Sequence, residues 1–441
     1  MCIRDRKYIV SVSVIVVLVF ICVVGVSSFS SVEDTAASVP VDDEPEQIHL
    51  NEMLTNRLSD CEELQKMDRD IERFMRKWGI KGVSLAVSRN DSLLYAKGYG
   101  WAEEEKGIRM EPSHILRMAS VSKLVTAVGI MKLQEEKKLK LTDKVFGPSG
   151  ILNDTAYAGS IRDKRYYKIS VEDLLRHRAG FTNRQGDPMF STRYIMIGNN
   201  LTSAPDHETL LKIILRRSLR YDPGTWQRYS NFGYLLLSMI IEKVSGMDYE
   251  TFMRKEVLEP AGCFDFRIAG NYYKDKYPNE VKYYVHDKAG LVDEYNNSGN
   301  QVERCYGGND VHNLAGAGAW CASAAEICRL VASVDMDSVV PDILDRRSIE
   351  AMTAYIDRST FPLGWADVKK NGEWVRSGTL SGTSALVKRY KDGECWVLIT
   401  NTSTWRGPYF TRETAKLFEM CRRKYGALFP NRNLFESDNP V

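Results

Sequence analysis

Residues 82–102 read GVSLAVSRNDSLLYAKGYGWA, and residues 374–403 read WVRSGTLSGTSALVKRYKDGECWVLITNTS. Both stretches contain short runs rich in Val, Leu, Ile, Tyr and Trp, and such runs are typical of β-strands. In the first stretch, Arg89-Asn90-Asp91 predicts a turn between two strands. The second stretch predicts three strands, at WVRSGTL, SALVKRYK and CWVLITNTS. Predicted strands therefore lie near both ends of the chain.

Helical patterns surround and separate these strands. A helix is predicted over about 62–78, where apolar residues recur at helical spacing. Further helices are predicted at 120–137, at 408–426 and near 170–177, 207–217, 232–246 and 321–334. This order predicts an α/β fold, in which an antiparallel sheet flanked by helices is built from both chain ends and a mainly helical lobe is inserted. A cleft between two such layers is a natural place for a ligand.

The composition is that of a globular protein. The 441 residues include 60 basic and 58 acidic side chains, and 44% of them are apolar. Residues 1–30 hold three basic residues and one acidic residue, so the rest of the chain is balanced in charge. Because a general nucleic-acid binder needs a basic face to neutralise phosphates, this balance argues against nucleic acid as a partner.

The N-terminal segment predicts export. Residues 8–26, YIVSVSVIVVLVFICVVGV, carry no charge, and a helix needs about 20 such residues to span a bilayer. Basic residues precede the segment and acidic residues follow it, which places the body outside the cytoplasm, in the periplasm or at the cell surface. An uncleaved membrane anchor and a cleaved signal peptide stay open as alternatives. The expected organisation is an anchor or signal peptide over 1–30, a tether over 31–61, one domain over 62–428 and a tail over 429–441.

Nine cysteines fit no metal-binding spacing. The chain has no C-x-x-C pair and no H-E-x-x-H motif, so we predict no metal and no other cofactor. Export would permit disulfides, and Cys61 with Cys421 is one hypothetical pair. The alternative is that the cysteines are mostly buried free thiols, which behave as small apolar residues.

Ser120-Val121-Ser122-Lys123 is the only S-x-x-K in the chain, and it opens a predicted helix. Residues i and i+3 share one face of a helix, so the Lys123 amine is expected beside the Ser120 hydroxyl. A serine hydroxyl is a weak nucleophile and needs a neighbouring base. A partly buried lysine can supply one, because burial lowers the pKa of its amine.

Two further segments carry chemistry. Tyr229-Ser230-Asn231 precedes a strong amphipathic helix, where a phenol could pass a proton to a leaving group and an amide could hold a substrate carbonyl. Arg376-Ser377-Gly378-Thr379 lies on a predicted strand, whose edge could supply an N–H group to an oxyanion. Taken singly, each segment also has an ordinary structural interpretation. The first would be a helix start, and the second would be a plain hairpin.

Together, in this order, the three segments resemble the serine β-lactamase and penicillin-binding-protein superfamily, and within it the class C β-lactamase-related branch of D-aminopeptidases, carboxypeptidases and esterases. The resemblance covers about residues 65–425. It rests also on ISVEDLLRHRAGF, DPGTWQRYSNFGYLLLSMIIEKVSG, LEPAGCFDF and AGAGAWCASAAEICRL.

The resemblance implies that Ser120 is acylated, that Lys123 and Tyr229 activate it and move protons, and that Asn231 orients the substrate. It also implies an oxyanion hole from the backbone N–H groups of Ser120 and Thr379, and a substrate-amide contact for Gln185. The family usually has Lys-Thr-Gly or His-x-Gly where this chain has Arg376-Ser377-Gly378. Arginine keeps the positive charge that could hold a substrate carboxylate, but it stays protonated and cannot relay a proton.

We therefore expect an extracytoplasmic serine hydrolase that forms an acyl-serine intermediate with a D-amino-acid peptide, a β-lactam or an ester. The expected partners are a small-molecule or peptide substrate, with peptidoglycan as one candidate, and a membrane through the N-terminal segment. The alternative is a penicillin-binding-like sensor or peptidoglycan-binding module that is acylated without turnover. The sequence leaves the oligomeric state open.

Overall fold

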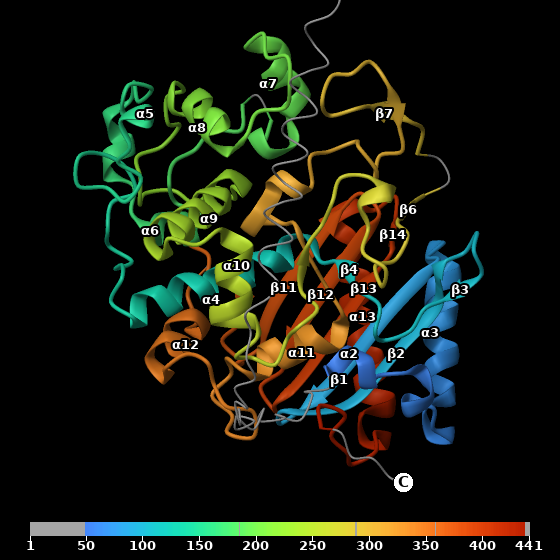
Figure 1. Cartoon of the computed structure of the whole chain (residues 1–441). Coiled ribbons are helices and arrows are strands. Elements are labelled where there is room, and N and C mark those ends of the chain that lie inside the picture. Colours follow the sequence, from blue (N-terminus) through green and yellow to red (C-terminus); the bar gives the residue numbers. More distant parts are fainter. Residues whose placement is uncertain (1–48, 185, 287–288, 358, 437–441) are drawn as a thin grey trace, which may run out of the picture. The chain divides into compact units, whose positions relative to one another are not determined.

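A seven-stranded antiparallel sheet organises the domain (Figure 1). The computed structural model describes residues 49–184, 186–286, 289–357 and 359–436. The strand order is β10-β11-β12-β13-β1-β2-β3. The strands are β1 (Gly82–Arg89), β2 (Ser92–Glu103), β3 (Ile108–Arg109), β10 (Asp367–Val368), β11 (Trp374–Leu380), β12 (Thr383–Arg389) and β13 (Glu394–Thr400). Because β1 pairs with β13, both ends of the chain build one sheet, and the predicted fold class is confirmed.

The turn between β1 and β2 follows from its sequence. Asn90 and Asp91 have φ angles of 46° and 60°, and a two-residue hairpin turn with left-handed backbone at both positions favours Asn and Asp there. The pairing of β1 with β2 then runs from Gly82 opposite Gly100 to Arg89 opposite Ser92. The predicted turn is therefore present.

Helices cover both faces of the sheet. In β13, Trp396 and Leu398 belong to one core cluster, and the alternating residues Cys395, Val397 and Ile399 belong to the other, because successive side chains of a strand point to opposite faces. The helices α3 (Gln65–Trp78) and α13 (Phe410–Tyr425) pack on the Trp396 face, and α11 (Ala324–Ala332) packs on the other. These three helices confirm the flanking layers that the sequence predicts.

The inserted lobe lies beside the sheet and is mainly helical (Figure 1). Its helices are α4 (Ser122–Glu135), α5 (Thr155–Ala158), α6 (Val171–Leu175), α7 (Thr192–Gly198), α8 (His207–Leu215), α9 (Asn231–Ser245), α10 (Tyr249–Met253) and α12 (Arg346–Thr353). Every residue of α4 from Ser122 to Met131 is buried, so this helix is enclosed on nearly all sides and has no single apolar stripe. The lobe is packed around α4 and α9, the two helices next to the candidate catalytic residues.

Within the described residues, seven short strands form three smaller sheets. They are β4 (Leu116–Arg117), β5 (Arg267–Ile268), β6 (Tyr284–Val285), β7 (Val292–Asp293), β8 (Gln301–Val302), β9 (Trp320–Ala322) and β14 (Thr402–Ser403). The three sheets are β4-β9-β5, β14-β6 and β7-β8. Residues 321–334 were expected to be one helix, but the first two belong to β9, which pairs with both β4 and β5. Ser323 then caps α11 by accepting a hydrogen bond from the Glu326 N–H, which explains why the helix begins later.

The segment around residues 49–61 is packed onto the domain. Leu50 of α2 (Leu50–Met53) and Leu54 are buried in the larger core, and the Ser59 Oγ of η1 (Asn56–Ser59) hydrogen-bonds both the N–H and the C=O of Ala96. The tether boundary predicted at residue 61 therefore lies too late in the chain. The predicted tail also differs, because the N–H of Leu434 donates to the C=O of Leu93 on β2.

The seven cysteines in the described part of the chain are all free, so the hypothetical pair of Cys61 and Cys421 is wrong. Cys421 is buried on α13 against the sheet, as the alternative of buried thiols predicts. The predicted anchor or signal peptide, residues 1–30, lies outside the described residues. Among the helices that the structure does describe, none is both long enough and apolar enough to cross a bilayer.

We expect Phe418→Ala to lower the free energy of unfolding by about 3–5 kcal/mol, because it removes a fully buried ring between α13 and the sheet. The ring centroid of Phe418 lies 5.5 Å from that of Trp396. Urea denaturation followed by tryptophan fluorescence measures the loss. Lys416→Ala, on the exposed side of the same helix, is the control, and equal losses for the two variants would contradict this packing.

Candidate active site

Ser120 lies on a short 3-10 turn, η3 (Ala119–Val121), directly before α4. The sequence predicts Ser120 in the first turn of the helix, whereas the structure places it one turn earlier. Ser120 still lies next to Lys123. Ala119 has a φ of 50°, a left-handed conformation that costs energy for a residue with a Cβ. This strained backbone points to a turn that its surroundings hold in place.

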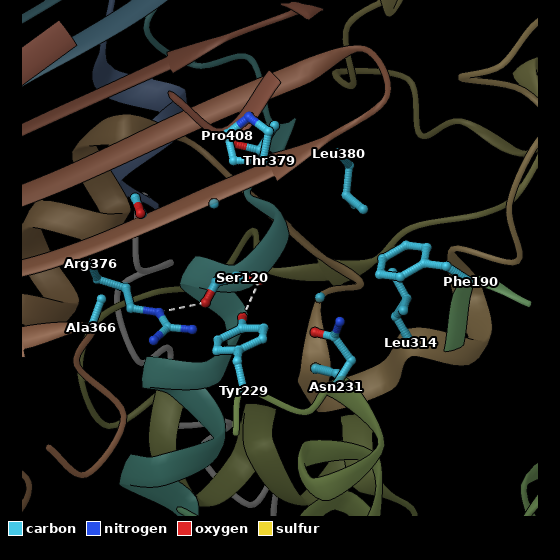
Figure 2. Close-up of a pocket in the computed structure, with 14 residues that line it drawn as sticks. Ser120, Phe190, Tyr229, Asn231, Leu314, Ala366, Arg376, Thr379, Leu380 and Pro408 are labelled. Carbon is cyan, nitrogen blue, oxygen red and sulfur yellow. Dashed lines mark hydrogen bonds between the residues drawn. The ribbon is translucent and has the colours of Figure 1, made fainter. Parts of the chain in front are cut away.

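Strand β11 holds that turn. A Cβ on Gly378 would lie 2.2 Å from the Met118 oxygen and 2.8 Å from the Ser120 nitrogen, so only glycine allows the two backbones to approach this closely. Two residues earlier, the Nε of Arg376 donates a hydrogen bond of 2.7 Å to the Ser120 carbonyl oxygen (Figure 2). The segment at Arg376–Gly378 therefore fixes the position of Ser120.

The Lys123 amine is buried and surrounded by acceptors. Its Nζ donates to the Ser120 Oγ at 3.2 Å, to the Asn231 Oδ1 at 2.7 Å and to the carbonyl oxygen of Ala317. Ala317 is the last residue of η8 (His312–Ala317). Burial lowers the pKa of Lys123; the Tyr229 phenol opposes this shift, and the Arg376 cation adds to it. The amine is therefore positioned and tuned to exchange a proton with its neighbours.

Tyr229 completes the group around Ser120. Its hydroxyl donates a hydrogen bond of 2.7 Å to the Ser120 Oγ, and its ring lies 4.9 Å from the Lys123 Nζ. Burial alone would raise the pKa of Tyr229, but the cations of Lys123 and Arg376 outweigh burial and lower it. The phenol can therefore lose its proton more easily than an ordinary tyrosine.

The start of α9 places Tyr229 and Asn231. Ser230 is the N-cap, and its Oγ accepts a hydrogen bond from the Gly233 N–H at 3.1 Å. Asn231 is the first helical residue, and its amide oxygen faces Lys123. A cap at Ser230 thus leaves both neighbouring side chains available to the site.

Asp187 is a site residue that the sequence analysis missed. Its Oδ2 accepts a hydrogen bond of 2.8 Å from the Asn231 Nδ2, and its Oδ1 accepts one of 3.0 Å from the Met189 N–H. Because Nδ2 is bound to the carboxylate, the amide oxygen of Asn231 must face the Lys123 amine. Asp187 followed by proline predicts a cap of a short helical turn, but that local signal says nothing about a contact 44 residues away.

His177 supports the phenol without touching Ser120. Its ring centroid lies 4.4 Å from that of Tyr229, and its Nδ1 accepts a hydrogen bond of 3.2 Å from the Ser230 N–H. Burial is the largest cause that holds the pKa of His177 well below its usual value, and the cations of Lys123 and Arg376 add to it. His177 is therefore a neutral residue that positions Tyr229.

A cavity of about 350 Å³ lies between β11 and the lobe, and Ser120, Tyr229, Asn231 and Arg376 line it (Figure 2). From Arg376 onward, β11 has no strand partner on this side within the described chain, so its edge borders the cavity. Figure 2 shows Arg376 on one side of Ser120 and three apolar side chains, Phe190, Leu314 and Leu380, on the other. The cavity thus offers a hydroxyl nucleophile, an open strand edge and an apolar wall.

The structure brings the three predicted segments together. Among the residues that line the cavity are the predicted Ser120, Tyr229, Asn231, Arg376, Ser377, Gly378 and Thr379. Gln185 lies outside the described residues. The side chain of Arg376 is only 1% exposed and is bound to the Ser120 carbonyl, so in this structure its visible role is to anchor the nucleophile. In the described ranges, no three His, Cys, Asp or Glu side chains are grouped as metal ligands would be.

Comparisons with known proteins agree with this architecture. The model of the Beta-lactamase family matches residues 67–418. PbpX of Bacillus subtilis (strain 168), which its name places among the penicillin-binding proteins, is 24% identical over 340 residues, covering 77% of this chain and 75% of that protein. Penicillin-binding protein 4* of the same organism is 28% identical over 217 residues, covering 49% of this chain and 43% of that protein.

Solved structures share the fold. The D-amino acid amidase from Ochrobactrum anthropi SV3 matches with a TM-score of 0.61 at 19% identity, over 82% of this chain and 98% of that one. The octameric penicillin-binding protein homologue from Pyrococcus abyssi matches with a TM-score of 0.59 at 21% identity, over 81% of this chain and 76% of that one.

We expect Gly378→Ala to slow the reaction of Ser120 with a fluorophosphonate about 100-fold, because the added methyl group displaces β11 from the nucleophile. Mass spectrometry of the Ser120 peptide over time measures the rate. Gly159→Ala is the matched control, since its Cβ would meet nothing within 4 Å and its φ is −66°. A Gly378→Ala rate within threefold of wild type would show that the close approach does not matter.

Proposed function

The chain belongs to the Beta-lactamase family, and from this premise we propose that it cleaves amide or ester substrates through an acyl-serine intermediate on Ser120. Serine hydrolase chemistry is a property of this family, and we propose which substrates this chain cleaves. The observation that carries it is the convergence of Ser120, Lys123 and Tyr229, from two segments 109 residues apart, within hydrogen-bonding distance at one cavity.

The hydrogen bonds define a route for the proton. The pKa of Tyr229 is lowered by the cations of Lys123 and Arg376, and in its phenolate form Tyr229 takes the proton from the Ser120 hydroxyl as Oγ bonds to the substrate carbonyl carbon. The same proton then passes to the leaving nitrogen or oxygen as its bond to that carbon breaks. Lys123, held by Asn231 and Ala317, can supply or accept this proton at the 3.2 Å contact with Ser120. Water then hydrolyses the ester and restores the serine.

The strand edge suggests how a substrate would dock. Ser377 and Thr379 alternate with the more buried Arg376 and Gly378 along β11, and all four border the cavity. A peptide-like substrate can pair with the open backbone of this strand, and the N–H groups of Ser120 and Thr379 are our proposed oxyanion hole. D-amino-acid peptides, β-lactams and simple esters all present a carbonyl that fits this arrangement.

We place the enzyme outside the cytoplasm, anchored or exported through its N-terminal segment. The support is the uncharged run at residues 8–26 with basic residues before it and acidic residues after it. In that location peptidoglycan is the candidate polymeric partner, which is consistent with the penicillin-binding names of two relatives.

Arg376 supports one alternative, a sensor or peptidoglycan-binding module that is acylated but does not turn over. Where the family usually has lysine or histidine in this segment, Arg376 stays protonated and is bound to the Ser120 carbonyl. It can stabilise charge, but it cannot pass a proton to or from water during hydrolysis of the ester.

We expect Ser120→Ala to abolish labelling by a fluorophosphonate and to lower hydrolysis of a p-nitrophenyl ester by a factor of about 10³ or more, because the nucleophile is gone. Ser122→Ala is the matched control, since the Ser122 Oγ accepts a hydrogen bond from the Trp320 N–H and does not line the cavity. Equal labelling of Ser120→Ala and wild type would refute the assignment. A penicillin adduct on Ser120 that persists for hours without released product would favour the sensor.

We expect Arg376→Gln to move the rising limb of the pH–acylation profile to higher pH. The Arg376 cation lowers the pKa of both Lys123 and Tyr229, so its removal raises both values, and the base forms appear only at higher pH. Arg376→Lys keeps the charge and should move the limb less. Single-turnover acylation rates measured across pH test this, and a shift to lower pH for Arg376→Gln would contradict it.

A further inference from the structure

A second cavity extends from the first along the end of β11. Its volume is about 660 Å³, and it shares Phe190, Thr379, Leu380 and Pro408 with the cavity at Ser120. A ligand that lies along β11 can therefore reach from Ser120 into the second cavity. Gly378 lies next to Ser120, and Ser381, in the turn directly after β11, lines the second cavity. The three residues between these positions span at most about 10 Å, at about 3.3 Å per residue.

The lining of this second cavity is suited to an anion. Among the described residues that line it, His286 and Arg304 are the titratable side chains, and none of these residues is a carboxylate. Hydroxyl groups come from Ser381 and Thr404, and the Thr404 Oγ1 is buried without a hydrogen-bond partner in the described structure. A buried hydroxyl without a partner costs free energy unless a ligand satisfies it.

Arg304 is presented from a fixed turn. The carbonyl oxygen of the next residue, Cys305, accepts a hydrogen bond of 2.8 Å from the buried Arg117, and the Gly307 N–H donates to the Asn271 oxygen at 2.9 Å. Cys305 and Gly307 are buried, whereas Arg304 is exposed. Arg304 has no ion pair or hydrogen bond with any described residue. Its guanidinium is thus available for a ligand, and the backbone that carries it is held in place.

Arg376 is less available for this role. It is 1% exposed and its Nε is bound to the Ser120 carbonyl, so its charge acts on the nucleophile and the phenol. An arginine binds a carboxylate most strongly when its planar donor groups are free to form two parallel hydrogen bonds. The buried Nη2 of Arg376 also has no hydrogen-bond partner among the described residues, but its guanidinium is enclosed beside Ser120, whereas Arg304 is exposed and can present its donor groups to a ligand in the second cavity.

We propose that Arg304 binds a carboxylate of the substrate in the second cavity, which extends about 10 Å along the chain direction of β11 from Gly378. This inference rests on the proposed function and specifies its substrate class, which is a peptide-like or acyl substrate with a remote negative charge. The carboxylate lies in the second cavity, where the Thr404 and Ser381 hydroxyl groups share in holding it.

The test uses p-nitrophenyl monoesters of glutarate, adipate, suberate and sebacate, each compared with its uncharged methyl diester. We expect kcat/KM to favour the charged ester about 10-fold or more at the suberate or sebacate length, and little at glutarate, because only the longer chains reach Arg304. Arg304→Met should remove this preference, Arg304→Lys should retain part of it, and added NaCl should weaken it.

Arg347→Met is the matched control, because Arg347 is an exposed arginine on α12 that does not line the groove. Hydrolysis of the methyl diester, which needs Ser120 but not Arg304, should be equal in all four proteins and shows that each is folded. Equal kcat/KM for charged and uncharged esters in the wild type, or a preference that survives Arg304→Met, would overturn the inference while the proposed function stands. Failure to hydrolyse any of the esters, together with no fluorophosphonate adduct, would remove the proposed function and this inference with it.

Discussion

The close approach of two backbones, at Gly378 on β11 and at the turn Met118–Ser120, is the constraint on which the site depends. The two segments are more than 250 residues apart, and the absence of a side chain at Gly378 lets them meet. The hydrogen bond from Arg376 to the Ser120 carbonyl holds the same junction. Because β11 belongs to the sheet and Ser120 leads into α4 of the lobe, this junction turns the edge of the sheet into a wall of the active-site cavity.

Burying charge next to the nucleophile creates a second constraint. Lys123 and Arg376 are both fully buried beside Tyr229, and an uncompensated buried cation would cost several kcal/mol. The acceptors at Asn231, Ala317 and Ser120 offset that cost for Lys123, and Asp187 keeps the amide of Asn231 in the orientation that does so. The same cations lower the pKa of Tyr229, so the groups that stabilise the site also prepare its proton transfer.

The two arginines at the groove lie in different environments. Arg376 is withdrawn from the surface and acts on Ser120 and Tyr229, whereas Arg304 stands free at the far end of the same groove. Phe190 lines both cavities, so a substrate that reaches Arg304 passes its ring. Recognition and chemistry are in this way placed at different positions along one strand edge.

Much of this protein is determined by its sequence. Strand composition, the Asn90-Asp91 turn and helical periodicity are local properties, so they predicted the sheet, its flanking helices and the inserted lobe, and the order of three short segments predicted Ser120, Lys123 and Tyr229. Contacts between distant segments were decided only by the tertiary structure. Three such contacts depend on the path of the loops over the sheet: Asp187 with Asn231, His177 with Tyr229, and residues 49–61 with β2. No local pattern records that path, because the partner of each residue is set by the register and layering of elements far away in the chain.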